Sequence, residues 1–146
     1  MRNSSKFVVA LSVSLLLAGC NDTEKTVVGT IDLKTELHQK ISPSAVLFII
    51  AKNANQEGGA PLAVKRFVQP FNFPLTFTLS AQDRMIADTP FEGKMNITAR
   101  IAQSGSAVPI GAGDIEGTAN PNPVEPNGKK ITLTLDQLVL PAISPK

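Results

Sequence analysis

The sequence predicts an all-β domain in which two sheets pack face to face. After the first 26 residues, apolar and polar residues alternate with a period of two in several short runs. Turn-forming residues separate these runs, and the chain holds 10 Gly and 11 Pro. No stretch has the 3.6-residue period of a long amphipathic helix. The apolar face of such strands must be covered, either by a second sheet packed face to face or by closure of the sheet into a barrel.

About seven short strands are expected. They cover residues 27–33, 45–51, 62–68, 75–80, 96–101, a short segment around Ile115, and 131–136. Seven strands in a chain of this size favour an immunoglobulin-like β-sandwich. A true antibody-type domain is excluded because it needs a cysteine pair and a core Trp, whereas this chain has one Cys and no Trp.

The patterns within the runs give more detail. Residues 45–51 are apolar on both faces, as a central strand would be. Residues 62–68 place Leu62, Val64 and Val68 on one face, which Arg66 interrupts, so this strand is expected near a sheet margin. Two further segments are not expected to be strands. Residues 34–40 fit about two helical turns, and residues 119–128 hold three prolines and three asparagines, typical of a loop.

The N-terminus has the three parts of a secretory signal. Arg2 and Lys6 form a positive region, residues 7–17 are an apolar run, and two small residues precede Cys20. Eleven residues of helix would cover about 16 Å, roughly half the hydrocarbon core, so the segment is too short to be a mature membrane anchor.

Leu17-Ala18-Gly19-Cys20 resembles the lipobox of bacterial lipoproteins. The resemblance implies cleavage before Cys20 and lipid, such as palmitate, on that cysteine. Residues 1–19 would then be the signal peptide, 20–26 a lipidated tether and 27–146 the β-sandwich domain. The alternatives are an ordinary signal peptide with a stray cysteine, or an uncleaved anchor.

The same resemblance bears on location in the cell. Asn21, rather than Asp, follows the cysteine, and by the sorting rule of enteric bacteria this favours the outer membrane over the inner membrane. Two or more acyl chains, at about 0.8 kcal/mol per buried CH₂, would make the anchoring stable. The expected protein faces the periplasm.

Composition excludes several function classes. Removal of Arg2 and Lys6 takes Lys+Arg from 14 to 12, equal to the 12 Asp+Glu, so the mature chain is formally neutral. The longest basic runs are Lys65-Arg66 and Lys129-Lys130, and there is no Trp or Tyr for base stacking. We therefore expect no nucleic-acid binding. With its one cysteine lipidated, the domain would hold no disulfide.

No constellation of catalytic or metal-binding residues appears, so an enzyme is not expected. His38 is the one histidine and lies in a polar stretch, and there is no Gly-x-Ser-x-Gly motif. A blue-copper site needs two His and a thiolate, which this chain lacks. Met85, Met95 and His38 would make at most a weak Cu(I) site. Apart from the lipid on Cys20, no cofactor or small-molecule substrate is expected.

Four of the seven Phe lie between Phe67 and Phe77. Phe71 and Phe73 stand between Pro70 and Pro74, which exclude a central strand there. These two rings are candidates for partner binding, as an exposed edge that receives an extended peptide by strand addition. The alternative is packing at a corner of the sandwich.

Several stretches resemble, in order and spacing, the C-terminal periplasmic domain of the cytochrome c-type biogenesis protein CycH, also called CcmI. They are Val46 to Ala51, Ala60 to Val64, Pro74 to Leu79, Asp83-Arg84-Met85, Ile97 to Gly105, and Gly113-Asp114-Ile115-Glu116-Gly117. The resemblance covers residues 45 to about 139. It implies an immunoglobulin-like sandwich and a role near cytochrome c maturation, with Asp114 and Glu116 either fixing the entry to the sheet or facing a partner.

The family's full protein has membrane helices and a tetratricopeptide region that grips apocytochrome. Neither part is found in this sequence, so apocytochrome binding cannot be transferred residue by residue. The leading hypothesis is a non-enzymatic, lipid-anchored interaction or assembly factor whose partners are cytochrome c maturation components. The alternative is a structural or pilotin-like lipoprotein that serves a secretion or pilus system. A periplasmic metal carrier is a weaker third hypothesis.

Overall fold

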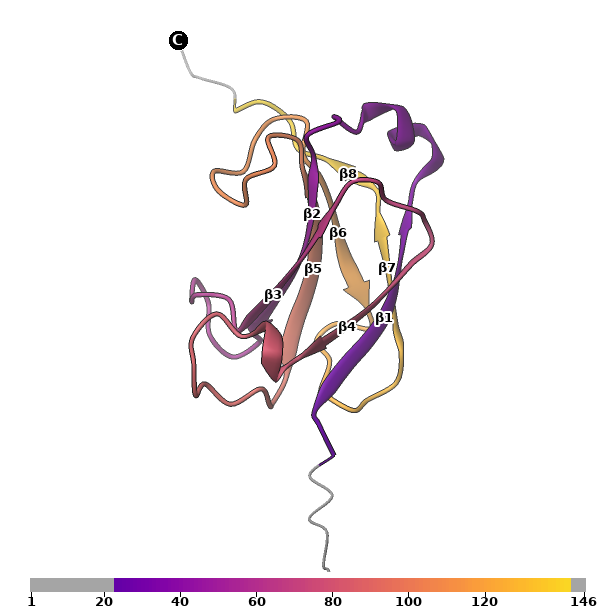
Figure 1. Cartoon of the computed structure of the whole chain (residues 1–146). Helices are drawn as coiled ribbons and strands as arrows, with labels where there is room; N and C mark the ends of the chain where they lie inside the picture. The colour runs from indigo at the N-terminus through magenta and orange to yellow at the C-terminus, as the bar shows by residue number, and fades with distance from the viewer. Residues whose placement is uncertain (1–22, 143–146) are drawn as a thin grey trace, which may run out of the picture.

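A computed structural model describes residues 23–142, and within them the chain forms eight strands and two short 3₁₀ helices (Figure 1). The signal peptide and residues 20–22 of the predicted tether, Cys20 included, lie outside the described residues. The elements in chain order are β1 (Thr26–Leu33), η1 (Thr35–Lys40), β2 (Val46–Asn53), β3 (Ala63–Val68), β4 (Leu75–Ser80), η2 (Ala81–Asp83), β5 (Met95–Ala102), β6 (Ile115–Asn120), β7 (Ile131–Leu135) and β8 (Gln137–Leu138). The predicted all-β class is confirmed.

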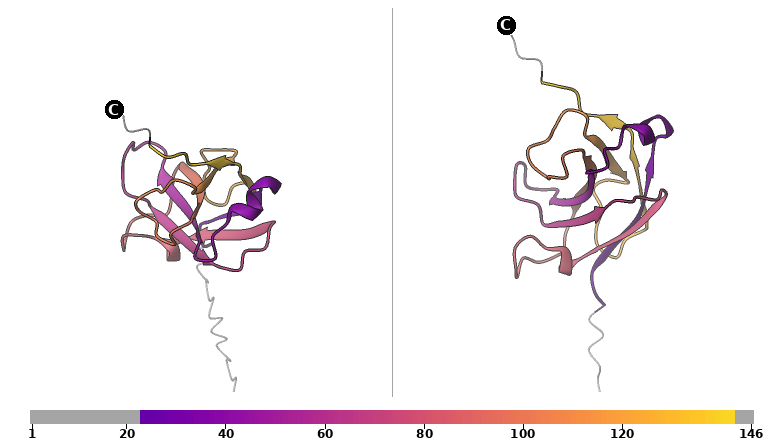
Figure 2. Two further views of the ribbon diagram at one scale, coloured as in Figure 1. Left: turned by 90° about the horizontal axis from the view of Figure 1, so that it is seen from above. Right: turned by 45° about the horizontal axis from the view of Figure 1, so that its top comes forward.

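The strands form one hydrogen-bonded path, β3-β2-β5-β6-β7-β1-β4, and β8 pairs with β6. The path folds over into two layers, sheet A with β4, β1 and β7, and sheet B with β3, β2, β5, β6 and β8. β6 joins the layers, because its first part pairs with β5 and its last two residues pair with β7. The result is a sandwich that is nearly a barrel (Figure 2), consistent with the predicted immunoglobulin-like architecture.

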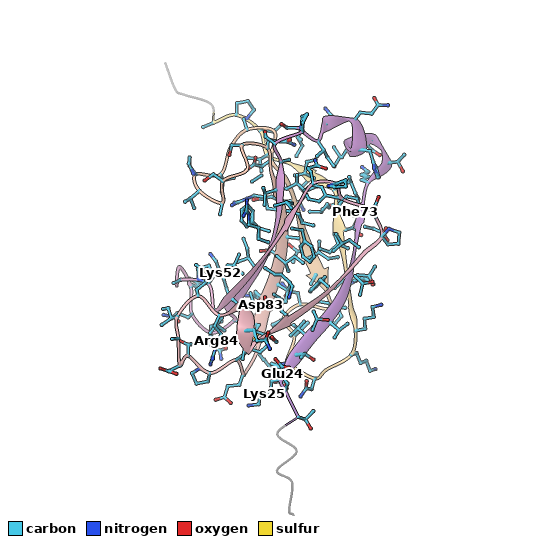
Figure 3. All side chains as sticks on the ribbon, viewed as in Figure 1. Glu24, Lys25, Lys52, Phe73, Asp83 and Arg84 are labelled. Carbon is cyan, nitrogen blue, oxygen red and sulfur yellow. The ribbon has the colours of Figure 1, made fainter. Side chains whose placement is uncertain are left out.

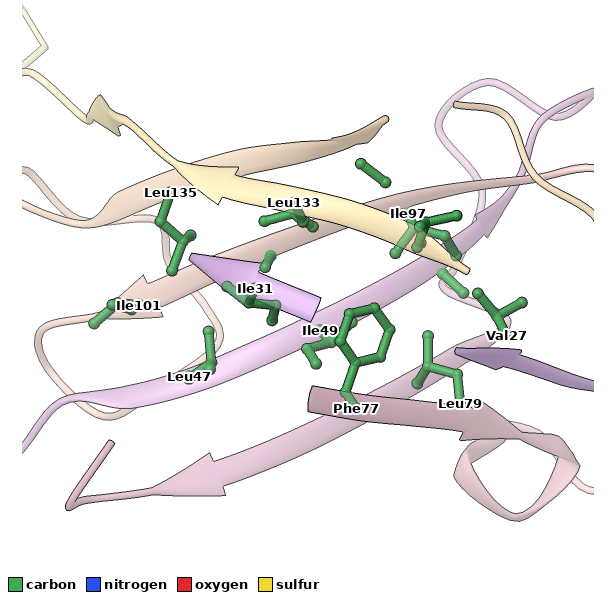
Figure 4. Packing of buried hydrophobic residues seen from close by; sticks show 14 of the residues in the cluster. Val27, Ile31, Leu47, Ile49, Phe77, Leu79, Ile97, Ile101, Leu133 and Leu135 are labelled. Carbon is green, nitrogen blue, oxygen red and sulfur yellow. The ribbon is translucent and has the colours of Figure 1, made fainter. Parts of the chain in front are cut away.

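The core lies between the two layers and is built by the alternation that the sequence predicted. Along β1 every second residue is buried, and the same pattern holds in β7 and most of β4, whereas the last four residues of β5 are all buried. Figure 4 shows the main contributors from both sheets: Val27, Ile31, Leu47, Ile49, Phe77, Leu79, Ile97, Ile101, Leu133 and Leu135. Full burial of one such side chain contributes about 1.5–3 kcal/mol, so this cluster supplies most of the drive to fold.

β2 is central and apolar on both faces, as predicted. Leu47 and Ile49 are fully buried on the inner face, and β3 and β5 flank the strand. On the outer face Val46 and Phe48 are 5% and 7% exposed, where they pack with Ala102 in a second, smaller cluster. A sheet face that would normally be wet is therefore partly covered.

β3 lies at one end of the strand path, so its predicted marginal position is confirmed, but the predicted assignment of its faces is wrong. Ala63 is fully buried and Phe67 packs against the inner core, whereas Val64 packs on the outer cluster and Val68 is 59% exposed. The sequence pattern did not identify the face with Ala63 and Phe67 as the inner one because Lys65 lies on it. A lysine stem can lie along apolar surface while its ammonium reaches polar partners.

Lys65 links the two free ends of the strand path, β3 and β4. Its Nζ donates to the carbonyl oxygen of Thr78 in β4 at 2.8 Å and to Asp83 Oδ1 at 3.2 Å. Asp83 is itself held, because its Oδ2 accepts the Ser80 backbone N–H at 3.0 Å in a capping box at η2. Lys65 therefore joins the edge of one sheet to the edge of the other.

Replacing Lys65 with Met is expected to lower the free energy of unfolding by about 1 kcal/mol, since one charge-assisted hydrogen bond and one ion pair are lost. Met keeps the length of the apolar stem. Lys52→Met is the matched control, because Lys52 is exposed and none of the ion pairs between residues 23 and 142 includes it. Urea unfolding followed by circular dichroism measures both variants. Equal midpoints would mean that the Lys65 link adds no stability.

Three predicted boundaries need correction. β6 extends to Asn120, two residues into the predicted loop 119–128, because it pairs with β7 before the prolines begin. β7 ends at Leu135, and the two-residue β8 after it was not predicted, since two residues carry no periodicity. β1 begins at Thr26, the last residue of the predicted tether. The predicted helical turns of residues 34–40 are the 3₁₀ helix η1, Thr35–Lys40.

Candidate functional site

The loop between β5 and β6 folds back over the outer face of sheet B, and Asp114 fixes both of its ends. Asp114 is 2% exposed. Its Oδ1 accepts the backbone N–H of Gln103 at 2.9 Å, and its Oδ2 accepts that of Gly111 at 3.0 Å. Two hydrogen bonds to backbone groups compensate the burial of this carboxylate. Of the two roles considered for Asp114, this geometry is that of a residue that holds the entry to β6.

Arg100 lies beneath that loop, on the outer face of β5, with its side chain 7% exposed. Its Nε is 3.7 Å from Asp114 Oδ2, its Nη1 is 3.7 Å from Glu116 Oε1, and its Nη2 donates to the carbonyl oxygen of Ala107. Nε itself donates no hydrogen bond. The charge of this buried guanidinium is balanced by two carboxylates.

Sequence reasoning placed Arg100 on an outward position of its strand and gave it no role. The register Phe48↔Arg100↔Glu116 across β2, β5 and β6 puts it at the centre of sheet B. No signal in the sequence indicates that a loop would cover it. The nearest hint was the resemblance that singled out Asp114 and Glu116, its two partners.

Glu116 differs from Asp114 in exposure, since its side chain is 39% exposed. It lines an open depression of about 180 Å³ on the outer face of sheet B. Lys52, Arg100, Ile50 and Ile110 line the same depression, together with Ala99, Thr98, Gly117, Thr118 and Gln137. The depression therefore combines apolar walls with charged groups of both signs.

Phe71 and Phe73 lie at the other edge of the molecule, in the connection from β3 to β4. Both rings are half-buried and pack against the inner core. Their ring centroids are 6.3 Å apart, and the rings of His38 in η1 and Phe73 make a T-shaped contact with centroids 6.0 Å apart (Figure 3 labels Phe73). The geometry is that of packing at a corner, and Pro70 and Pro74 offer no backbone N–H to an added strand.

The three side chains considered for a weak Cu(I) site lie apart. His38 is exposed, Met85 is 58% exposed and Met95 is fully buried, so these three do not form one surface. Within residues 23–142 no three His, Cys, Asp or Glu side chains are grouped as metal ligands. No helix in that same range has the length and apolar character needed to cross a membrane.

An exposed ion pair lies at the end of the domain where the chain enters. Lys25 Nζ is 2.7 Å from Glu92 Oε2, and this hydrogen bond holds the pKa of Glu92 below its usual value (Figure 3 labels Lys25). A similar contact between Lys34 and Glu36, at 2.8 Å, lowers the pKa of Glu36 and raises that of Lys34. Both pairs are solvated and contribute little to stability.

Comparison with known proteins gives one match. The family described as "Cytochrome c-type biogenesis protein H Ig-like domain" matches residues 27–136, from β1 to the residue after β7. No curated protein and no solved structure matches significantly. The match begins earlier than the resemblance over residues 45 to about 139, and it includes strand β1 from Val27 onward. Because it covers most of the chain and agrees with the observed fold, the chain belongs to the family of cytochrome c-type biogenesis protein H Ig-like domains.

Proposed function

We propose that this protein is a lipid-anchored module of the bacterial envelope that binds protein partners in cytochrome c biogenesis and has no catalytic activity of its own. The observation that carries the proposal is the family match over residues 27–136. It relates the chain to cytochrome c biogenesis through its β-domain. That domain is the part of the molecule available for contact with partners.

The lipid anchor is supported by the sequence around Cys20. The lipobox-like Leu17-Ala18-Gly19-Cys20 follows an apolar run at the position where a lipid-bearing thiol must stand, and Cys20 is the one cysteine of the chain. The mature chain is formally neutral, so it has little electrostatic attraction to an anionic membrane. Lipid would then be the main hold on the membrane, and Asn21 favours the outer one.

The non-enzymatic role is supported by the use of the buried polar groups. Ser80, Arg100 and Asp114 are the buried polar or charged residues among those that the structure describes. Ser80 caps η2, and the other two hold the β5–β6 loop. Each of these groups is engaged in structural contacts, which fits a binding module.

Affinity purification of the lipidated full chain from detergent-solubilised envelopes tests the proposed partners. We expect components of haem ligation or apocytochrome delivery to co-purify. We also expect cells that lack the protein to contain less c-type cytochrome by haem staining. Recovery of secretion or pilus components instead, with normal cytochrome content, would overturn the proposal in favour of the pilotin-like alternative.

Replacing Cys20 with Ala tests the anchor. The variant is expected to lose incorporation of labelled palmitate and to leave the membrane fraction if the leader is still removed. The β-domain should fold normally, since Cys20 precedes β1. Asn21→Asp is the matched control, which should keep the label and move the protein towards the inner membrane. A Cys20→Ala protein that still carries palmitate would contradict the assignment.

A further inference from the structure

The outer faces of the two sheets differ in character. On sheet A the outward positions are polar apart from Val28, and Thr76, Thr30 and Thr132 lie side by side across β4, β1 and β7. This is the usual pattern for a wet sheet face. The outer face of sheet B carries large apolar side chains among its charged ones instead. We call its incompletely covered side chains the outer patch, which consists of Ile50, Val64, Val68, Val108 and Ile110.

The most exposed members of the outer patch come from the β5–β6 loop. Val108 is 75% exposed and Ile110 is 56% exposed, while Ala107 between Arg100 and the loop tip packs on the outer cluster. In Figure 1 this loop, drawn in orange, stands out from the upper left of the domain. Two apolar side chains are thus held in water by a loop whose base is buried.

That loop is fixed in place. Asp114 holds its two ends through the N–H groups of Gln103 and Gly111, and Arg100 donates to the carbonyl oxygen of Ala107 in its middle. A surface held in one conformation loses little entropy when it binds a partner. The buried Arg100 and Asp114 therefore act as positioning residues for Val108 and Ile110.

Charge on this face is unbalanced. Lys52 and Arg66 are exposed on outward positions of β2 and β3. Neither takes part in any ion pair found between residues 23 and 142. Glu116, the acid that lines the same face, is 3.7 Å from Arg100. The outer patch is therefore flanked by two cations without acidic partners.

The position of the patch argues for a protein rather than a membrane as its occupant. The chain enters the domain through β1, which belongs to sheet A, whereas the patch lies on the outer face of sheet B. A bilayer that holds lipid on Cys20 would approach from the end of β1, shown at the bottom of Figure 1. Patch and anchor therefore do not share one face.

From these observations we infer that the outer patch is a docking surface for an amphipathic segment of a partner protein that carries Asp or Glu beside its apolar side chains. One apolar side chain enters the depression between Ile50 and Ile110, which has about 180 Å³ of free space. Carboxylates of the same segment pair with Lys52 and Arg66. The inference rests on the proposed function in one respect, namely that the occupant is a protein.

Site-specific photo-crosslinking in living cells tests this docking surface. Benzoyl-phenylalanine is placed at Val108 or Ile110 of the full lipidated chain, and at Thr76 or Thr132 on the opposite sheet as matched controls. We expect protein adducts from the first pair at about tenfold higher yield than from the second, because interface-centre positions dominate binding. The crosslinked partner peptide, sequenced by mass spectrometry, should contain Asp or Glu next to apolar residues.

The charge requirement is tested with Lys52→Glu combined with Arg66→Glu. This variant should reduce the yield from the Ile110 crosslinker about tenfold, since like charges now face each other. Lys129→Glu with Lys130→Glu is the control and should leave the yield unchanged. Thermal unfolding of each variant shows whether the fold is intact. An intact double variant that crosslinks as strongly as the parent would overturn the charge assignment.

The outcomes separate this inference from the proposed function. Adducts with lipid, adducts with a segment lacking acidic residues, or no adducts from Val108 and Ile110 would overturn the docking surface. Adducts with a cytochrome maturation component from Thr76 or Thr132 alone would overturn the surface and support the proposed function. Adducts from Val108 and Ile110 with an acidic segment of an unrelated secretion protein would support the surface and overturn the proposed function.

Discussion

Replacement of Asp114 with Ala is expected to lower the free energy of unfolding by about 3–5 kcal/mol, since it removes one partner of a buried ionic network. The substitution leaves the N–H groups of Gln103 and Gly111 without their acceptor. It also takes from Arg100, whose side chain is 7% exposed, the more deeply buried of its two carboxylates. An unpartnered buried donor or cation costs more than the net gain of the bond it loses.

Two further variants calibrate this result. Asp114→Asn keeps one acceptor oxygen but removes the charge. Its free energy of unfolding should therefore lie between that of the parent protein and that of Asp114→Ala. Glu116→Gln should cost at most about 1 kcal/mol, because that side chain is 39% exposed and solvent screens the pair. Urea unfolding by circular dichroism gives all three values. A loss below about 1 kcal/mol for Asp114→Ala would mean that the loop relaxes and that the network is not needed for stability.

Gly117→Ala is expected to cost about 3 kcal/mol or more, because overpacking against the main chain cannot be relieved by a rotamer change. A Cβ at this position would lie 2.1 Å from the carbonyl oxygen of Thr134 and 2.8 Å from its carbon. Gly117 stands where β6 leaves sheet B and approaches β7 of sheet A. The strand can cross between the layers at this point because glycine leaves room for the neighbouring backbone.

Gly111→Ala provides the matched control for Gly117→Ala. A Cβ at Gly111 would meet Asp114 no closer than 3.6 Å, an ordinary contact, so we expect a change within about 1 kcal/mol. Thermal unfolding and the soluble yield of both variants give the comparison. Similar melting temperatures for the two variants would show that β7 can shift away from β6 at little cost.

The sequence predicted most of the strands because a half-buried strand imposes a period of two. That signal worked best in β1, β4 and β7, where one face is core and the other faces solvent. It failed in β3, where Lys65 occupies an inner position and Val68 an outer one. In that strand a lysine lies on the inner face and a valine faces solvent, so the polar and apolar residues do not mark the outer and inner faces in the usual way.

The candidate site was less predictable than the fold. The resemblance singled out Asp114 and Glu116 together, yet the structure gives them different environments, one fully buried and one half-exposed. Arg100 was missed because its role depends on a loop that closes over the sheet. Val108 and Ile110 could not be recognised from the sequence, since single apolar residues in loops are common. The structure shows that Ile110 lines the same depression as Lys52.

The place of β7 in the strand order has a consequence for biogenesis. β7 is the last long strand in the chain, yet it lies in the middle of the path, between β6 and β1. Until residues 131–135 are available, no ladder of backbone hydrogen bonds joins β1 and β4 to the other strands. The N-terminal strand β1 therefore pairs with its parallel neighbour only after the C-terminal end of the chain is available. Such long-range pairing slows folding. A chain that ends before Ile131 would lack β7, the strand that connects β6 to β1, rather than a strand at the edge of the path.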